Sequence, residues 1–235
     1  MALLTRWQDD TTPPTAREAG RDLAVRAVAP TVLWWMVVVG IGWLLTDGPL
    51  KEAGASEGSL NKSLASSRTS FWDAVTLVFS WAGATASIIG LCLVVVAVVW
   101  WRTREWWFAV VPLIAISLQA MVFFFTTLLI DRERPEVKKL DDSPPTSSFP
   151  SGHTGAAAGL YFTLALMALR IPHPVLRRVV VAVCLIMPFG VASARLYRGM
   201  HHVSDVLMAI VNGLVAALLA WCWLRRSAGD DQTRA

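Results

Sequence analysis

The sequence predicts an all-α integral membrane protein, a bundle of six transmembrane helices with both termini in the cytoplasm. Two measures of composition lead to this fold class. Of the 235 residues, 55% are hydrophobic and only 16% are charged, whereas soluble domains carry about 25% charged residues. The mean hydropathy is +0.52. A third observation is that the apolar residues gather in stretches long enough to cross a bilayer.

Six such stretches are predicted to be spans, because a crossing helix needs roughly 20 mostly apolar residues. The first begins near Ala29-Pro30 and stops at the polar residues 46–48. The last three contain Gly and Ala at intervals, as helix contacts in lipid prefer. The predicted spans are residues 29–46, 84–101, 107–130, 151–169, 177–194 and 203–224.

Three segments make up the predicted domain organisation. Residues 1–28 form a cytoplasmic segment, within which residues 16–28 are predicted to make a short amphipathic helix on the membrane surface. Residues 29–224 form the transmembrane domain, and residues 225–235 form a cytoplasmic tail. No secretory signal peptide is evident, because the N-terminal region is polar and contains acids.

The longest connection between spans is residues 49–82. Its second half, from Phe71 to Trp81, has apolar residues at helical spacing. We expect this stretch to be either a helix at the membrane interface or a lid over the loop between the third and fourth spans.

Lysine and arginine are divided unevenly between the two ends of the predicted bundle. Twelve lie on the side of the termini and nine on the other. Four of those nine (Arg132, Arg134, Arg195 and Arg198) belong to the motifs described below, which leaves five against twelve. Because cytoplasmic loops carry the excess of these residues, both termini should be cytoplasmic. Six tryptophans are predicted to form a belt at that interface: Trp100, Trp101, Trp106, Trp107, Trp221 and Trp223.

Composition also excludes several classes of protein. The net charge of +4 is small and the basic residues form no nucleic-acid-binding face. The three cysteines (Cys92, Cys184 and Cys222) lie inside apolar stretches, without the spacing of a disulfide framework or a metal site. We therefore expect no cofactor, no bound metal and no nucleic-acid partner. Oligomeric state is left open.

Charged and polar residues gather in two of the three outer loops. The first of these loops carries DRERP at 131–135 and PSGH at 150–153, and the second carries RLYRGMHHVSD at 195–205. Two loops at one membrane level can share a pocket if the last four spans pack together. Ionisable residues at such a place are expected to be functional.

The second loop offers a nucleophile and a group to orient it. His201 and Asp205 are spaced i, i+4 and share one face at the start of the last span. The carboxylate can accept a proton from one ring nitrogen, which leaves the other nitrogen free to attack. A structural ion pair capping the helix is the simpler alternative.

The remaining motif residues suit an oxyanion. Ser151 is a natural N-cap for the fourth span, and Gly152 lets the backbone approach a phosphate closely. Arg134 and Arg195 can grip phosphate oxygens in bidentate fashion. His153 is left as the general acid for the leaving oxygen. A zinc site is disfavoured, because the arginines would repel a cation.

These blocks resemble the signature of the type 2 phosphatidic acid phosphatase superfamily, which also includes vanadium haloperoxidases and glucose-6-phosphatase. The signature reads K-x6-R-P, then P-S-G-H, then S-R-x5-H-x3-D, and the resemblance covers residues 107–224. The resemblance implies that His201 becomes a phosphohistidine, that His153 protonates the leaving group, that Asp205 completes the catalytic set, and that no metal is required.

Two positions depart from the signature. The first-block lysine falls on Thr127, and the serine before Arg195 falls on Ala194. Thr127 can hydrogen-bond a phosphate oxygen but brings no charge. The missing charge could come from a neighbouring cation, and the sequence leaves open which one: Arg132, Lys138 or Lys139. The predicted phosphate-binding set is therefore Arg134, Arg195, Ser151, Gly152, Thr127 and Arg132.

The predicted function is a membrane phosphatase that hydrolyses a phosphomonoester or pyrophosphate of a lipid at the outer face of a bacterial inner membrane. Candidate substrates are a polyprenyl pyrophosphate, phosphatidic acid and phosphatidylglycerol phosphate. A lipid phosphotransferase and a decayed member that only binds anionic lipid are the alternatives. Other polar residues nearby are predicted to be rim or solvated-loop residues: Tyr197, Arg198, His202, Lys138, Lys139, Asp141 and Asp142.

Overall fold

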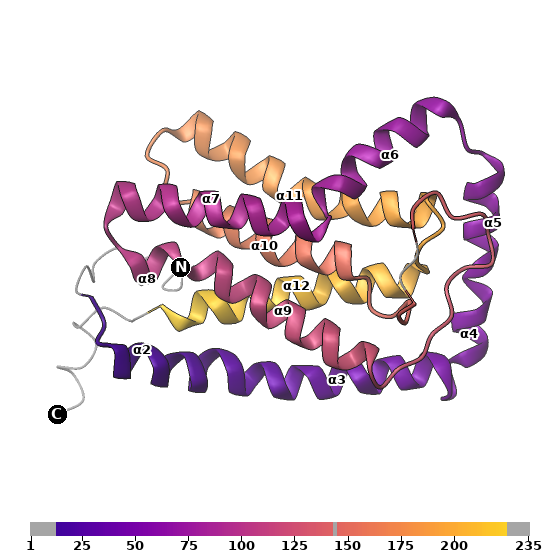
Figure 1. Ribbon diagram of the computed structural model, residues 1–235, viewed down its shortest axis with the longest axis horizontal. Coiled ribbons are helices and arrows are strands. Elements are labelled where there is room, and N and C mark those ends of the chain that lie inside the picture. The colour runs from indigo at the N-terminus through magenta and orange to yellow at the C-terminus, as the bar shows by residue number, and fades with distance from the viewer. Residues whose placement is uncertain (1–12, 143–144, 225–235) are drawn as a thin grey trace.

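The computed structural model describes residues 13–142 and 145–224, and every regular element within them is a helix. Six long helices lie roughly side by side (Figure 1). They are α3 (Ala29–Thr46), α7 (Thr85–Thr103), α9 (Val111–Thr127), α10 (Gly152–Ala168), α11 (Pro174–Tyr197) and α12 (Val203–Trp223). The shorter elements are α2 (Ala16–Leu23), the π-helical η1 (Ala24–Val28), α4 (Lys51–Ser56), α5 (Gly58–Ser66), α6 (Ser70–Ala82) and α8 (Trp106–Ala109).

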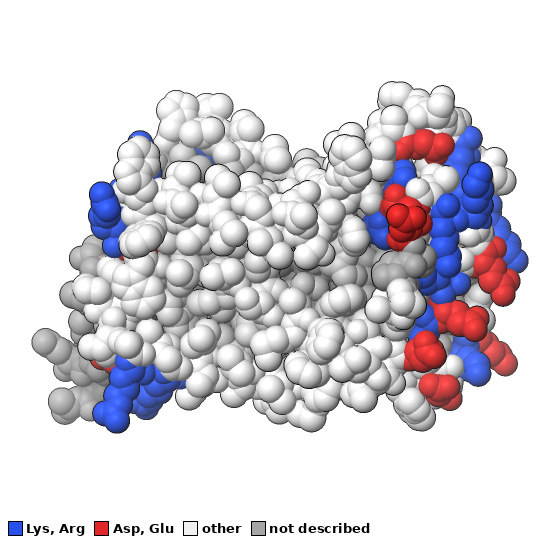
Figure 2. Space-filling model, viewed as in Figure 1, with Lys and Arg blue, Asp and Glu red and all other residues white. Residues whose placement is uncertain are grey.

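Five helical stretches are long and apolar enough to cross a membrane. They are Ala16–Thr46, Thr85–Thr103, Trp106–Thr127, Pro174–Tyr197 and Val203–Trp223. Each contains most of one predicted span. The predicted fourth span corresponds to α10, which has 17 residues and packs among the others. Charged side chains gather at the two ends of the molecule, and an uncharged band lies between them (Figure 2). The chain is a multi-pass, all-helical membrane protein.

Helix α10 occupies the centre of the bundle and contacts α12, α11, α9 and α7. Small residues allow this arrangement. A Cβ added at Gly213 on α12 would lie 2.3 Å from the Ala158 Cβ and 2.6 Å from the Gly159 nitrogen on α10. The two backbones therefore approach too closely for any side chain at position 213. This contact packs α10 directly against α12.

The N-terminal helix differs from the prediction. Residues 16–28 were expected to form a separate helix on the membrane surface, but α2, η1 and α3 form one continuous rod (Figure 1). The rod starts with a capping box, in which the Thr15 side chain accepts from the Glu18 N–H and Glu18 accepts from the Thr15 N–H. The expected boundary at residue 28 is therefore not a break in the helix.

Residues 49–82 are helical and cross one end of the bundle as α4, α5 and α6 (Figure 1). We call this end the α4–α5 end and the opposite one the far end. Helix α6 packs against α11, where a Cβ added at Gly190 would lie 2.4 Å from the Phe79 ring. Its outer side exposes Phe71 and Trp81, at 66% and 65%. Such a surface suits the membrane interface, one of the two expectations for this stretch.

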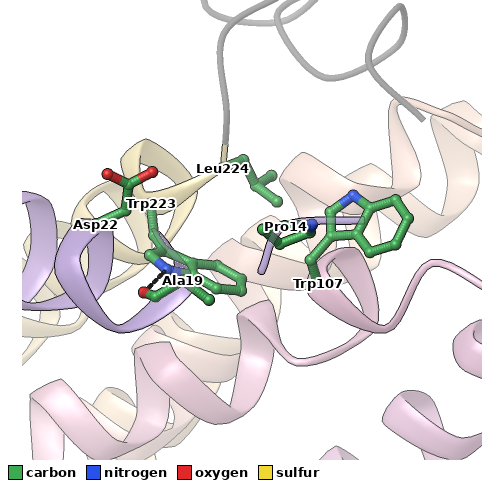
Figure 3. Close-up of a pocket in the computed structure, with 6 residues that line it drawn as sticks. All are labelled: Pro14, Ala19, Asp22, Trp107, Trp223 and Leu224. Carbon is green, nitrogen blue, oxygen red and sulfur yellow. Dashed lines mark hydrogen bonds between the residues drawn. The ribbon is translucent and has the colours of Figure 1, made fainter. Parts of the chain in front are cut away.

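Tryptophan packing at the far end also departs from the prediction. Trp107, Trp221 and Trp223 are buried in one apolar cluster, whereas Trp100 and Trp101 are exposed. The Trp223 Nε1–H donates to the Ala19 carbonyl at 3.1 Å, which ties α12 to α2 (Figure 3). The cavity beside this contact holds only about 10 Å³. Three of the six tryptophans therefore pack the bundle instead of forming a belt.

Candidate active site

The two motif-bearing loops meet at the α4–α5 end. The Leu140 N–H donates to the Arg198 carbonyl at 3.1 Å, which joins the loop after α9 to the end of α11. The Ser151 N–H donates to the Asp205 carbonyl at 3.2 Å, which joins the start of α10 to the start of α12. The structure thus brings together the motif regions that lie far apart in the sequence.

His201 lies at the centre of this region, in the turn between α11 and α12, and is 3% exposed. Its Nδ1 is 2.8 Å from the Ser148 carbonyl oxygen. A carbonyl oxygen only accepts hydrogen bonds, so Nδ1 carries the hydrogen and Nε2 carries the lone pair. No hydrogen bond among the described residues uses Nε2. Burial lowers the pKa of His201 below its usual value although Asp205 acts in the opposite direction, so the ring is neutral.

Asp205 has more partners than the sequence suggested. Its Oδ2 accepts from the Ser148 hydroxyl at 2.5 Å and from the His202 N–H at 2.7 Å, and its Oδ1 accepts from Arg132 Nη1 at 2.6 Å. The His201 Nδ1 is 3.7 Å from Oδ2, too far for a direct hydrogen bond. The expected histidine–carboxylate hydrogen bond is therefore replaced by a contact through Ser148. Asp205 remains close enough to stabilise a positive charge on the ring.

His153 is half-buried at the start of α10 and lies within electrostatic reach of His201, Arg195 and Arg134. No hydrogen bond in the described part of the chain restrains its ring. The two histidines thus lie at the same end of the bundle and face one cluster of charge.

The start of α10 differs in detail from the prediction. Ser151 is the N-cap residue, but its hydroxyl donates to Thr154 Oγ1 at 3.0 Å and makes no capping hydrogen bond. The N–H groups of Gly152 and His153 have no partner among the described residues, so this helix start is still able to bind an anion. A Cβ added at Gly152 would lie 3.0 Å from the Phe123 ring. Packing is therefore one physical reason for this glycine.

Arg195 is held through one of its three guanidinium nitrogens. Its Nη1 donates to Asp141 Oδ2 at 2.6 Å and to the Ser80 hydroxyl at 2.8 Å. Its Nε is buried and has no partner in the described part of the chain. The edge formed by Nε and Nη2 is consequently free for two parallel hydrogen bonds to a phosphate.

Arg134 is held through both of its terminal nitrogens, since its Nη2 donates to the Thr146 carbonyl at 3.5 Å. Its Nη1 donates to the Met200 carbonyl at 3.0 Å, and its Nε is buried without a partner among the described residues. Burial lowers the pKa of Arg134 from its usual value, but an arginine side chain stays charged at neutral pH. Two arginines thus retain buried nitrogens that a bound oxyanion could satisfy.

The other two predicted phosphate ligands lie differently. The Thr127 hydroxyl donates to the Phe124 carbonyl one turn earlier at 2.8 Å, and no described hydrogen bond joins it to the His201 region. Arg132 is 7% exposed and donates to Asp205 and to the Ser204 hydroxyl, both at 2.6 Å. Arg132 therefore lies in the site but is bound to protein groups.

Asp141 was expected to be a solvated loop residue, and this expectation is wrong. Its carboxylate accepts from Arg195 and, at 2.8 Å, from Arg198 Nε. Burial alone would raise the pKa of Asp141, but hydrogen bonds from Arg198 and Ser80 and the charges of both arginines hold it below the usual value. Arg198, expected at the rim, is 5% exposed. These long-range pairs leave no local pattern in the sequence.

A cavity of about 580 Å³ opens beside the site, between α4, α5 and the loop after α9. Arg134 and His202 line it on the side of the site, and Lys51, Lys62 and four acidic residues line it elsewhere. It is large enough for a polar headgroup. Among the described residues, no group of three or more His, Cys, Asp or Glu side chains is arranged to hold a metal ion.

The family model of the PAP2 superfamily matches residues 108–228, which include all three sequence blocks. The chain belongs to the PAP2 superfamily. This confirms the resemblance inferred from the sequence blocks. No curated protein matches this PAP2 chain significantly.

Two solved PAP2-like structures resemble the chain. A transmembrane PAP2-type phosphatidylglycerolphosphate phosphatase from Bacillus subtilis has a TM-score of 0.69 and 20% sequence identity, over 88% of this chain and 96% of that one. LpxE from Aquifex aeolicus has a TM-score of 0.56 and 18% identity, over 69% of this chain and 92% of that one. At these identities the likeness establishes a shared fold.

Proposed function

We propose that this PAP2 chain is a lipid phosphatase that works through a phosphohistidine at His201. One observation carries the proposal. The hydrogen bond from Nδ1 to the Ser148 carbonyl leaves the lone pair on Nε2, and Arg195 and Arg134, whose buried Nε atoms have no partner among the described residues, lie within electrostatic reach of the ring. A neutral imidazole next to an oxyanion site is the arrangement that nucleophilic phosphoryl transfer needs.

In the first step, Nε2 of His201 attacks the phosphorus atom in line with the leaving oxygen. An N–P bond forms, and the P–O bond to the lipid alcohol, or to the inner phosphate of a pyrophosphate, breaks. His153 donates a proton to the leaving oxygen, and the negative charge of the bound phosphate favours its protonated form. Arg134, Arg195 and the start of α10 neutralise the charge on the equatorial oxygens.

In the second step, water attacks the phosphorus atom and the N–P bond breaks. His153 accepts the proton of the water, inorganic phosphate leaves, and the neutral His201 is restored. Between the steps the phosphorylated ring is positively charged. The Asp205 carboxylate, 3.7 Å from Nδ1, stabilises that charge. The reaction as proposed needs no metal ion and no cofactor.

The substrate class follows from the location of the site. His201 lies at one end of an apolar bundle, so the phosphate can meet the arginines while acyl or prenyl chains stay in the bilayer. We propose six spans, with α10 as the fourth, and an orientation that puts the α4–α5 end outside a bacterial inner membrane. The lysine and arginine count supports this orientation. A polyprenyl pyrophosphate, phosphatidic acid and phosphatidylglycerol phosphate remain the candidate lipids.

The test is phosphate release by the purified protein in detergent, measured with each of these lipids. We expect release with at least one lipid, inhibition by vanadate, and no loss in EDTA. His201→Ala should abolish release. His173→Ala is the matched control, because His173 caps α11 at the far end and should be dispensable. Absence of release with every lipid, or full activity of His201→Ala, would refute the proposal.

A further inference from the structure

We propose that Arg132 is a positioning residue that holds Asp205 beside the nucleophile and does not bind the substrate phosphate. The inference rests on the proposed phosphohistidine mechanism. It also concerns the first block, in which Thr127 stands where the signature has a lysine: Arg132 does not replace that lysine as a phosphate ligand. Arg132 lies inside the first block, between Thr127 and Pro135, and both of its terminal nitrogens already donate hydrogen bonds to protein groups.

The terminal nitrogens of Arg132 are already occupied. Nη1 donates to Asp205 Oδ1 and to the Ser204 hydroxyl, both at 2.6 Å. Nη2 donates to the Gly54 carbonyl at 3.2 Å and lies 3.7 Å from a Glu57 oxygen. A phosphate would have to displace these groups. Arg195, by contrast, already presents a free edge.

Asp205 needs this counter-ion. The carboxylate is 0% exposed, and a buried negative charge without a partner is very costly. The neutral His201 supplies no positive charge. Arg132 therefore keeps Asp205 ionised while the nucleophile stays neutral, so that both groups are in the form that attack requires.

Removing the guanidinium would affect the nucleophile directly. The hydrogen on Nδ1 is fixed by the Ser148 carbonyl, so an extra proton drawn by an uncompensated Asp205 would bind to Nε2. That nitrogen is the one proposed to attack phosphorus. The other charged and titratable groups that face His201 are Arg195 from α11, Arg134 from the loop after α9 and His153 from α10. All three remain in an Arg132 variant, and the two arginines, as cations, disfavour the extra proton.

Residues from the 49–82 segment support the loop that carries His201. Glu57 accepts from the Ser204 N–H at 2.9 Å and from its hydroxyl at 3.0 Å, within the first turn of α12. The Asn61 side chain donates to the His201 carbonyl at 3.1 Å. Helices α4 and α5 thus support the loop of the nucleophile from outside, and Arg132 connects the two.

The decisive measurement is a pH titration of the histidine ring nitrogens by NMR, on the full chain in detergent. The chain has four histidines, so His201→Ala identifies the relevant signal. We expect the titration midpoint of His201 to rise by about one pH unit in Arg132→Gln, and to stay near wild type in Arg132→Lys. Arg178→Gln, the same change at an exposed position in the far half of α11, is the control. An unchanged or lower midpoint in a folded Arg132→Gln would overturn the proposal.

Kinetics with an active lipid separate this role from phosphate binding. For Arg132→Gln we expect kcat to fall about 10-fold or more, with KM and vanadate inhibition within about 2-fold of wild type. A phosphate ligand would instead show a raised KM and weakened inhibition by vanadate, which would contradict the inference. In an Asp205→Asn background, Arg132→Gln should add little, because it acts through Asp205. If the wild type released no phosphate, the proposed function would be refuted. The NMR titration needs no turnover, so it tests the positioning role of Arg132 independently.

Discussion

The two ends of the bundle differ in how completely their side chains are packed. At the far end, Trp107, Trp221 and Trp223 are buried in one apolar cluster, and the cavity beside Trp107 and Trp223 holds about 10 Å³. At the α4–α5 end, a cavity of about 580 Å³ opens beside Arg134, and the buried Nε atoms of Arg134 and Arg195 have no partner among the described residues. Buried donors without partners lower stability by about 1–3 kcal/mol each. This difference supports the proposal that the α4–α5 end binds an oxyanion, whereas packing at the far end stabilises the bundle.

The largest expected effect is on phosphate binding at the α4–α5 end. Arg195→Ala should lower kcat/KM by about 10²–10³-fold, because a preorganised donor to the transition state is lost. Arg178→Ala removes an exposed arginine from the far half of α11 and should leave kcat/KM unchanged. Equal losses of kcat/KM in the two variants would contradict a specific role of the α4–α5 end in phosphate binding.

A complementary change at the far end should affect stability alone. Trp223→Ala removes a buried ring and its hydrogen bond to the Ala19 carbonyl, so the free energy of unfolding should fall by about 3 kcal/mol. Thermal unfolding in detergent measures this loss. The kcat/KM of the folded variant, assayed below its unfolding temperature, should match wild type. A large drop in kcat/KM there would show that the two ends are coupled.

A smaller effect on kcat/KM is expected from changing Asp141, the ion-pair partner of Arg195. Asp141→Asn keeps the size of the side chain but removes the charge that anchors Arg195 and Arg198. We expect kcat/KM to fall about tenfold, because Arg195 loses its fixed orientation. Asp142→Asn, the same change at the exposed neighbouring position, serves as the comparison. Undiminished activity in Asp141→Asn would show that Arg195 is positioned by its own helix.

The smallest effect is on the pH profile. Burial lowers the pKa of His201, so the neutral nucleophile persists below the usual histidine pKa of about 6.5. On the acid side, kcat/KM should therefore stay high at pH 6.5 and decline only as the pH falls through the lowered value. A profile from pH 4 to 8 checks this expectation. A decline centred above 6.5 would mean that the Asp205 charge outweighs burial.

The sequence predicted the bundle better than it predicted the contacts. Hydropathy located α3 at residues 29–46 because a span must be long and apolar. It could not show that α2 and η1 continue that helix, since helix continuity depends on packing as well as composition. It also could not separate buried from lipid-facing tryptophans, because both environments are apolar.

At the site, the motif spacing singled out His201, Asp205 and Arg195, because these residues lie in short blocks. The partners that hold them were not evident. Asp141 is 54 residues from Arg195 along the chain. Ser148 acts on His201 through its backbone carbonyl, a group that every residue has. Such partners become visible only when the loops are folded together.

The most direct test of the mechanism is to trap the covalent intermediate. The full chain would be mixed with a lipid carrying a labelled terminal phosphate, quenched in alkali, where phosphohistidine survives, and mapped by mass spectrometry. We expect label on His201, attached at Nε2, and none in His201→Ala. Label on another residue, or complete turnover with no labelled protein at any time, would contradict it.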